Sequence, residues 1–412
     1  MAPYESDDST TAAEADDLRA GRRKAARYVV PVAVVGVAAA TIGLVPALAD
    51  SGDPDLPKIS AQQLIDKIAK SDVQQMSGTV KITTDLGLPD LGGLESSLTS
   101  GATKSGDGSS ADPTSKLTEL ATGTHTLRVA ADGPDRQKVS LLENAAEYSL
   151  IHNGKDVWGY DSQSNEVYHS TAPDNAAEQK KDDVPATPKD LTEDALKAVD
   201  DTTSVTVQGT AQVAGRDAYR LVIKPKQSGS TVGQITVAVD SKTGLPLKFT
   251  LTPASGGAAV IDAGFTQVSF AKPSASTFTF TPPKGAKVTE DSQTDHANGH
   301  FEGSLKGDDK TGKSDKDLGK DLGKGPDGLN VIGKGWTSIA TFDTGGQGMP
   351  SGSEAGGQFG GFLDSLGDKV SGKFGSGTVF KTRLINALIT DDGKVYVGAV
   401  SKDALVKAAN AG

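Results

Sequence analysis

One stretch of the sequence has the letters of a phosphate-binding loop. Residues 307–314 read Gly-Asp-Asp-Lys-Thr-Gly-Lys-Ser, which matches the pattern G-x-x-x-x-G-K-[ST]. Such a loop holds phosphates with backbone amides only where a buried strand precedes it and a helix follows it. Residues 303–306 do not resemble a strand, and the glycines within 314–325 oppose a helix. We therefore interpret the match as a coincidence in a segment biased toward glycine and lysine.

The histidines suggest metal binding as a second possible chemistry. His296 and His300 have the four-residue spacing of two ligands on one helix face, but no Glu or Asp lies between them as in the HExxH motif. We interpret them as a pair in a solvated segment. His125, His152 and His169 are spread over separate predicted strands. The sequence therefore predicts no metal and no cofactor.

Nucleophilic and acid–base catalysis also lack a signature. The chain contains no G-x-S-x-G motif, no spacing that selects a Ser–His–Asp triad, and no distinctive pair of carboxylates. It has no cysteine, which excludes thiol nucleophiles, disulfides, cysteine-ligated metals and a lipid attached to cysteine. We expect a protein that is not an enzyme, with a hydrolase as the remote alternative.

The charge balance bears on the choice of partner. The chain has 412 residues and a formal net charge of -11. Nucleic-acid binding requires clustered cations that neutralise phosphates. We therefore expect no nucleic-acid partner.

A single apolar run, residues 28–48, is long enough to cross a bilayer, which takes roughly 20 residues. Five basic residues precede it within 19–27, and it ends near the A-x-A pattern of residues 47–49. The run is therefore either a retained transmembrane signal anchor or a signal peptide cleaved after Ala49. Both readings place the chain beyond Asp50 outside the cytoplasm. The anchor reading makes the protein a single-pass membrane protein, and the cleaved reading makes it a secreted one.

Composition and periodicity divide the chain into five parts. We expect a disordered cytoplasmic tail (1–27), the membrane or signal segment (28–48), a main domain (59–286) with an insertion (86–124), a disordered linker (287–328) and a small C-terminal α/β block (329–412). Within the C-terminal block, the pattern predicts strands at 331–342, 378–390 and 394–400 and a helix at 401–409. The stretch 345–377 is glycine-rich.

The main domain has the pattern of an α+β fold with one large antiparallel sheet. Helical spacing predicts helices near 60–71 and 187–199, the first with a capping box at Ser60. Short alternating segments predict strands at 77–84, 124–131, 137–142, 147–152, 156–161, 166–170, 204–213, 217–224, 233–240, 246–252, 259–270 and 276–281. The dipeptide Asn153-Gly154 favours a type I′ hairpin turn.

Four local motifs, in order along residues 60–285, resemble the LolA/RseB-like (outer-membrane lipoprotein carrier protein-like) family of exported bacterial proteins. The segments 60–65 and 76–80 are similar to the family's opening helix and first strand. Residues 213–221 read V-x-G-x-x-x-Y-x-L, residues 240–246 read D-x-x-T-G-L-P, and residues 278–285 read F-x-F-x-x-P-x-G. The resemblance covers a little over half of the chain. The insertion, the linker and the C-terminal block depart from the family.

The resemblance implies a curved antiparallel sheet that forms an incomplete, LolA-like barrel with helices in its mouth, preceded here by the transmembrane or signal helix. Carrier members of the family hold a lipid or a lipoprotein acyl chain in the concave apolar space. RseB-like members act as envelope sensors through protein–protein contact. The expected partners are therefore a lipid or acyl chain, the cell membrane through residues 28–48, and an envelope protein as the alternative.

The apolar strand faces supply the candidate lining of such a cavity. The predicted ligand-binding residues are Val80, Ile82, Leu127, Val129, Leu150, Trp158, Tyr219, Leu221, Ile235, Val237, Phe249 and Phe265. Ordinary sheet core is the alternative role for each of them. The leucines of residues 86–98 could form a mobile lid over the cavity.

Overall fold

The computed structural model describes residues 53–87, 109–113, 116, 119–171, 187–290, 330–343 and 367–411. Every described residue lies within 53–412, which forms one compact unit. Within the described residues, no helix combines the length and apolarity needed to span a membrane. The tail 1–27, the segment 28–48, the loop-like match at 307–314, and the pair His296 and His300 all lie outside the described residues.

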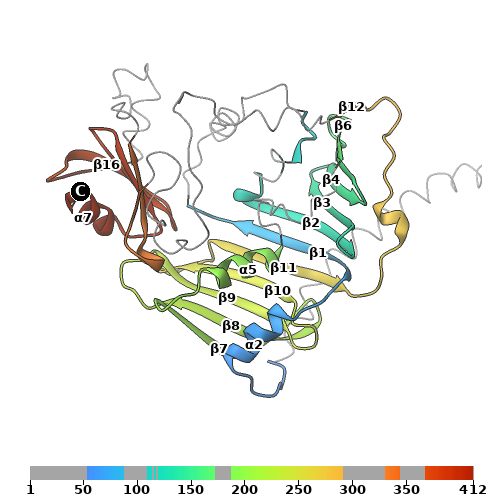
Figure 1. Cartoon of the computed structure of the whole chain (residues 1–412), viewed down its shortest axis with the longest axis horizontal. Coiled ribbons are helices and arrows are strands. Elements are labelled where there is room, and N and C mark those ends of the chain that lie inside the picture. The colour runs from blue at the N-terminus through green and yellow to red at the C-terminus, as the bar shows by residue number, and fades with distance from the viewer. Residues whose placement is uncertain are drawn as a thin grey trace, which may run out of the picture. The chain divides into compact units, whose positions relative to one another are not determined.

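Twelve of the described strands form one large sheet (Figure 1). In chain order they are β1 Gln75–Thr84, β2 Gly123–Asp132, β3 Arg136–Glu143, β4 Ala146–Asn153, β5 Asp156–Asp161, β6 Glu166–Thr171, β7 Thr203–Val213, β8 Arg216–Pro225, β9 Val232–Asp240, β10 Pro246–Pro253, β11 Ile261–Ser269 and β12 Lys287–Glu290. Their order across the sheet is β12-β6-β5-β4-β3-β2-β1-β11-β10-β9-β8-β7. All of these pairs are antiparallel except β12 with β6, which is parallel.

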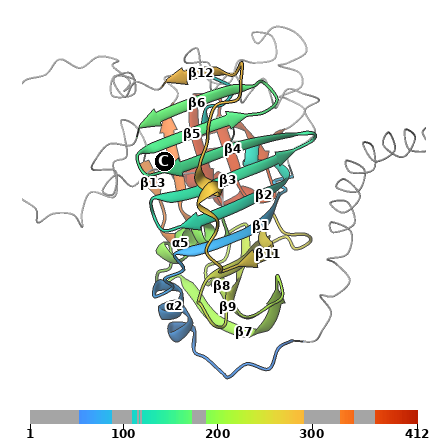
Figure 2. The same cartoon turned by 90° about the vertical axis from the view of Figure 1, so that its right-hand side faces the viewer.

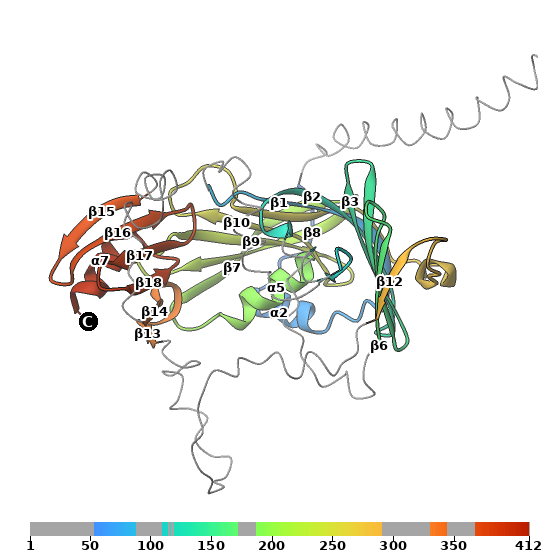
Figure 3. The ribbon, with the colours of Figure 1, turned by 90° about the horizontal axis from the view of Figure 1, so that it is seen from above.

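The large sheet is strongly curved and does not close. Its edges are β12 and β7, which do not pair with each other. Figure 3 shows the bend, with the strands β3–β6 turned away from the plane of β7–β10. The helices α2 (Ala61–Ala69) and α5 (Pro188–Lys197) lie on one face of the β7–β10 part (Figure 1). The expectation of an open, curved antiparallel sheet is therefore confirmed.

Local turn chemistry explains why neighbouring strands of the sheet form hairpins. At the β7–β8 turn, Ala214 and Gly215 both have positive φ, 51° and 74°, which is the pattern of a type I′ turn. Such a turn matches the right-handed twist of the two strands that it joins. The bulge between Thr79 and Val80 adds local curvature where β1 pairs with β11.

The C-terminal residues form a second sheet of six described strands in the order β13-β14-β18-β17-β16-β15. Its elements are β13 Asn330–Ile332, the 3-10 turn η4 Gly335–Thr337, β14 Ile339–Asp343, β15 Gly367–Gly372, β16 Gly375–Lys381, β17 Asn386–Thr390, β18 Lys394–Gly398 and the helix α7 Lys402–Ala411. Leu405, Ala408 and Ala409 of α7 pack on Val379, Leu388 and Tyr396 of the sheet.

Several expected strands of the C-terminal block are wrong in detail. The strand expected over 331–342 is split by η4, and the one expected over 378–390 is split by a turn at 382–385. In that turn the Thr382 hydroxyl accepts a hydrogen bond from the backbone amide of Ile385 (2.8 Å), which ends the ladder. The glycine-rich stretch also contributes a strand, β15, because Lys369 and Val370 pair with β16.

Two expectations at the end of the main domain are also wrong. Residues 276–281 form no strand: the 3-10 turn η3 (Ala275–Phe278) forms instead, and it buries Phe278. Residues 287–290, expected to open a disordered linker, form β12 on the edge of β6. Both segments are fixed by contacts with distant strands rather than by their own sequence pattern.

The hairpin between β4 and β5 differs in turn type from the expected one. Asn153 pairs with Asp156, so the two central residues are Gly154 and Lys155. A type I′ turn needs positive φ at both positions, and of these two only Gly154, at 66°, has it. One positive φ at the first central residue is the pattern of a type II′ turn.

Candidate functional site

The concave face of the large sheet is covered by helices over the β7–β10 part, which we call the closed half. Leu64 and Ile68 of α2 and Ala195 of α5 pack against strand residues there. These partners are Tyr219, Leu221, Ile223, Ile235, Val237, Val239, Phe249 and Leu251, and all of them are buried. This half is a packed core.

The family-like turn at 240–246 positions α2 over the closed half. Gly244 has φ +77°, and a Cβ added to it would lie 2.4 Å from the backbone oxygen of Lys67 in α2. Asp240 holds the turn, because its carboxylate accepts hydrogen bonds from the backbone amides of Lys242 (3.0 Å) and Thr243 (2.6 Å). The turn motif therefore serves close packing between helix and sheet.

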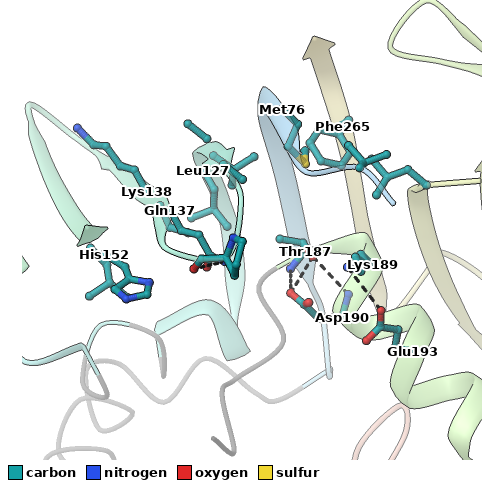
Figure 4. Close-up of a pocket in the computed structure, with 18 of the residues that line it drawn as sticks. Met76, Leu127, Gln137, Lys138, His152, Thr187, Lys189, Asp190, Glu193 and Phe265 are labelled. Atoms are coloured by element: carbon teal, nitrogen blue, oxygen red, sulfur yellow. Dashed lines mark hydrogen bonds and ion pairs between the residues drawn. The ribbon is translucent and has the colours of Figure 1, made fainter. Parts of the chain in front are cut away.

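Over the β1–β4 part of the concave face, which we call the open half, lies a cavity of about 890 Å³. Its apolar lining residues are Val73, Met76, Leu120, Leu127, Val129, Val139, Leu141, Leu150, Val157, Leu245 and Phe265. Figure 4 shows Met76, Phe265 and Leu127 on the sheet side, with Thr187, Lys189, Asp190 and Glu193 of α5 beside the opening.

The floor of the cavity is built by strand register. Leu127, Leu141 and Tyr148 are cross-strand partners in one row over β2, β3 and β4. Val129, Val139 and Leu150 form the adjacent row. Because side chains alternate between the two faces of a strand, both rows point to the same side of the sheet. Val139 and Leu150 are only half-buried, unlike the strand residues under α2.

The rim of the cavity is polar and is formed largely by the first turns of α5. Thr187 caps this helix: its hydroxyl accepts from the backbone amide of Asp190 (3.3 Å), whose carboxylate accepts from the backbone amide of Thr187 (3.0 Å). Lys189 and Glu193 form an exposed ion pair at 3.8 Å. His152, from β4, lies across the opening in Figure 4.

The lining of the cavity includes a partly buried cation, Lys116. The ammonium of Lys116 lies 2.9 Å from a Glu143 oxygen and 3.5 Å from oxygens of both Glu119 and Asp161. Burial alone would lower the pKa of Lys116, but the Glu143 hydrogen bond and the nearby carboxylates outweigh it and raise that pKa. Lys116 is therefore protonated and held, so the apolar floor ends against a charged wall.

A short segment, residues 109–112, closes the concave face beyond that wall. The Tyr148 hydroxyl donates to the Ala111 backbone oxygen (3.1 Å), and Glu166 accepts from the amide of Ser110 (2.8 Å) and the hydroxyl of Ser109 (3.1 Å). The hydrogen bonds from the Ser110 hydroxyl and amide, followed by that from Lys287, lower the pKa of Glu166 to about 2. Burial raises the pKa of Tyr148, so it stays a neutral donor.

The structure divides the twelve predicted lining residues among four places. Leu127, Val129, Leu150 and Phe265 line the cavity. Val80 and Ile82 do not line it; they belong to the buried core cluster that also contains Leu127, Val129 and Phe265. Tyr219, Leu221, Ile235, Val237 and Phe249 lie in the packed core of the closed half. Trp158 stacks on His169, with ring centroids 3.7 Å apart, and does not line the cavity. Ligand binding by these residues stays a prediction.

Sequence reasoning missed several residues of the site. Val139 and Leu141 alternate within a predicted strand, so the same pattern that selected Leu127 and Val129 could have selected them. Met76 stands in the first of the family-like motifs. Tyr148 alternates with Leu150 in the same way. Lys116 carries no local signal, because its role depends on its ion pairs with Glu143 and Asp161, far along the chain. Of the lid expected at residues 86–98, the structure describes only Leu86 and Gly87. Leu86 packs against the core of the closed half.

The described residues contain no group of three or more His, Asp or Glu side chains placed to hold a metal ion. The polar side chains around the cavity are used mainly in ion pairs and caps. The arrangement can therefore enclose an apolar group, and its charged residues bound that group at both ends.

Residues 109–290 match a family model described as a predicted periplasmic protein, DUF2092. This range contains most of the strands that line the cavity. The description agrees with the extracytoplasmic location expected for the chain beyond residue 50. A search of curated proteins finds no match.

Among solved structures, the chain is similar to a complex of MucA and MucB from Pseudomonas aeruginosa, with 15% identity over 85% of this chain and 96% of that chain, TM-score 0.39. It is also similar to a LolA superfamily protein from Nitrosomonas europaea, with 12% identity over 54% of this chain and 99% of that chain, TM-score 0.22. A conserved protein from Thermus thermophilus matches with 14% identity over 56% of this chain and 99% of that chain, TM-score 0.30. A LolA superfamily protein is therefore among the solved structures to which this chain is similar. These similarities do not specify a ligand or a partner.

Proposed function

We propose that the protein is an extracytoplasmic binding protein that accommodates a lipid or a lipoprotein acyl chain in the cavity of the open half. The observation that carries the proposal is the uneven cover of one sheet: α2 and α5 pack on the closed half, whereas two apolar rows of the open half face a cavity of about 890 Å³. Ligand cavities in proteins commonly measure about 300–1,000 Å³.

The energetics favour a hydrocarbon occupant. Removing one methylene from water is worth about 0.8 kcal/mol, so a chain along the two rows would gain affinity with each methylene that it buries. The charged groups at the inner wall and at the rim offer no such gain to hydrocarbon. The apolar part of the ligand would therefore lie on Leu127, Val129 and Leu150, with its polar end toward the α5 rim.

The test is lipid capture by the purified full-length chain. Native mass spectrometry after extraction in mild detergent should detect a co-purifying lipid, and a fluorescent fatty acid should bind saturably. Leu150→Arg places a cation on the half-buried floor and should reduce fatty-acid affinity at least tenfold.

Val331→Arg is the matched control for Leu150→Arg. Val331 is an exposed apolar residue of the C-terminal sheet, 50% exposed, and lies outside the cavity lining. Its substitution should leave fatty-acid affinity unchanged. Absence of any co-purifying lipid together with absence of fatty-acid uptake would refute the proposal.

A specific feature favours a second candidate, an RseB-like envelope sensor that acts by protein–protein contact. The short edge strand β13 exposes Val331 (50%) and Ile332 (40%), and the neighbouring β14 exposes Phe342 (39%). Exposed apolar groups on a sheet edge are typical of surfaces that pair with another chain. Crosslinking in native membranes should then yield a stoichiometric protein adduct that Val331→Arg abolishes.

The membrane association and the lack of catalysis are proposals as well. We propose that residues 28–48 remain as a single-pass anchor that holds the binding domain outside the cytoplasm. A mature N-terminus at Asp50 would exclude this anchor and leave the secreted form. We also propose that the cavity has no catalytic role, which a turnover of ester or glycoside substrates by the purified protein would contradict.

A further inference from the structure

The edge of the large sheet farthest from the closed half is finished by a short strand from much later in the chain. β12 lies against β6 in parallel register, with Lys287 opposite Glu166 and Glu290 opposite His169 (Figure 2). β12 has four residues, and its Val288 is 42% exposed. Little apolar burial therefore stabilises the pairing of β12 with β6, so the pairing depends on polar contacts.

A histidine joins the two strands at the far end of β12. The Nδ1 atom of His169 lies 2.6 Å from an oxygen of Glu290 on β12, and its Nε2 atom lies 3.1 Å from an oxygen of Asp156 on β5. These two carboxylates are the charged groups that face the ring from the strands on either side of it. One face of the ring stacks on Trp158, with centroids 3.7 Å apart and planes 13° apart.

Whether the His169 ring can donate hydrogen bonds to both carboxylates depends on its protonation state. A protonated imidazole has two N–H donors, so it can donate to both carboxylates at once. A neutral imidazole has one donor and one acceptor, so one carboxylate then faces a lone pair. Stacking on an indole also favours the cationic ring. The contact between β5, β6 and β12 is therefore complete only when His169 is protonated.

We propose that His169 is a pH-sensitive latch that holds β12 on the edge of β6 when protonated and releases it when neutral. Release would leave the hydrogen-bonding groups on the outer edge of β6 without a partner strand, which is the condition for pairing with another extended segment. The latch does not depend on what the cavity binds, because Trp158 and His169 are not part of the cavity lining.

The direction of the pH effect follows from the contacts. Burial alone would lower the pKa of His169, but the hydrogen bonds and charges of Asp156 and Glu290 outweigh it and raise that pKa above 6.5. A group whose pKa is raised by a contact stabilises that contact fully below its ordinary pKa and loses the effect as the pH rises through the raised value. Higher pH therefore releases β12.

The other polar contacts of β12 lie at its opposite end, at Lys287. Lys287 pairs with Glu166 at 3.1 Å, and its backbone amide donates to the Asn165 backbone oxygen at 3.2 Å. The pKa of Glu166 is about 2, so this carboxylate stays ionised at neutral pH. A pH response between about 6 and 9 therefore reports on His169 rather than on the opposite end of the strand.

The experiment is hydrogen exchange on the full chain in detergent micelles, between pH 5 and pH 9, corrected for the intrinsic pH dependence of exchange. Protection of the backbone amides of residues 287–290 should be highest below pH 6.5. It should then fall by about tenfold for each unit by which the pKa of His169 exceeds its ordinary value. Amides of β8 in the closed half should show no such step.

Variants make the test specific to the latch. In His169→Gln the protection of residues 287–290 should be low at every pH, because the neutral amide group cannot donate to both carboxylates with the geometry of the ring. Glu290→Gln, at an exposed position, should flatten the pH step without affecting folding. His125→Gln is the matched control, because His125 lies on β2, hydrogen-bonds to the backbone oxygen of Thr122 and is no part of the β6–β12 contact.

Two results would overturn the proposal. One is protection of residues 287–290 that stays constant while the NMR signals of the His169 ring titrate. The other is the same pH step in His169→Gln as in the unsubstituted chain. Either result would mean that backbone pairing alone holds β12.

Discussion

The closed and open halves of the concave face are made of the same kind of strand and differ in what lies over them. In the closed half, Leu64 and Ile68 of α2 cover Leu221 and Val237, and these strand residues have no exposed surface. In the open half, Val139 and Leu150 occupy equivalent inward positions but are only half-buried and line a cavity. Apolar side chains on the closed half therefore stabilise the fold, whereas Val139 and Leu150 on the open half are accessible to a ligand.

The largest expected effect is a difference in stability loss between leucine truncations in the two halves. Leu221→Ala removes a fully buried side chain and should lower the free energy of unfolding by about 2–5 kcal/mol. Leu150→Ala should cost about 1 kcal/mol or less, because solvent already reaches this side chain. Urea denaturation of both variants measures the difference. Equal losses would mean that the open half is packed as tightly as the closed half.

The next effect tests how α2 is seated on the closed half. Gly244→Ala places a methyl group 2.4 Å from the Lys67 backbone oxygen at φ +77°, and should cost about 2–4 kcal/mol. Gly215→Ala is the matched control, since φ there is +74° but nothing lies within 4 Å, and should cost about 1 kcal/mol. Thermal unfolding compares the two. A Gly215 variant as unstable as the Gly244 variant would show that backbone strain, not helix contact, sets the cost.

A pH-dependent effect is expected at β6 at acid pH. The ionised Glu166 holds Ser109 and Ser110, and its pKa is lowered from 4.5 to about 2. A lowered pKa means that the stabilisation is present above pH 4.5 and is lost as the pH falls toward 2, by roughly 2 kcal/mol in all. Hydrogen exchange at the Ser110 amide should rise over this range. Glu166→Gln should remove the dependence, and a persistent acid step in that variant would assign it to another carboxylate.

Smaller effects are expected from the two helix caps. Ser60→Ala in α2 and Thr187→Ala in α5 each remove a capping box and should each cost about 1 kcal/mol. Because α5 also forms the cavity rim, only Thr187→Ala should weaken fatty-acid binding, by severalfold. Fatty-acid titration of both variants measures this. Equal affinities would remove α5 from the ligand site.

The parts of the fold that sequence predicts well are the ones encoded locally. The strand 156–161 and the hairpin at Ala214-Gly215 follow from alternation and turn residues, and the capping box at Ser60 is readable from four letters. β12 could not be predicted, because its pairing with β6 joins residues more than a hundred positions apart. Local propensity carries no information on such a pairing.

The same limit applies to the candidate site. Alternation places Leu127 and Val129 on one face, but it does not say whether a helix or a cavity lies over that face. Leu150 and Leu221 therefore look equivalent in sequence, although Leu150 lines the cavity and is only half-buried, whereas Leu221 is fully buried in the packed core. Trp158 likewise shares a face with Tyr160, and both rings contact Phe280 instead of the cavity. Which rows are covered depends on the placement of α2, α5 and residues 109–113.

The most direct test of the central claim is photo-crosslinking of the full-length chain with a fatty acid that carries a diazirine near its methyl end, followed by mapping of the adducts by mass spectrometry. Occupation of the open half predicts adducts on the β2–β4 rows, at or beside Val139 and Leu150, that excess unlabelled fatty acid prevents. Leu221 and Val237 should carry none. Adducts confined to residues outside the cavity, or labelling that unlabelled fatty acid does not reduce, would contradict the claim.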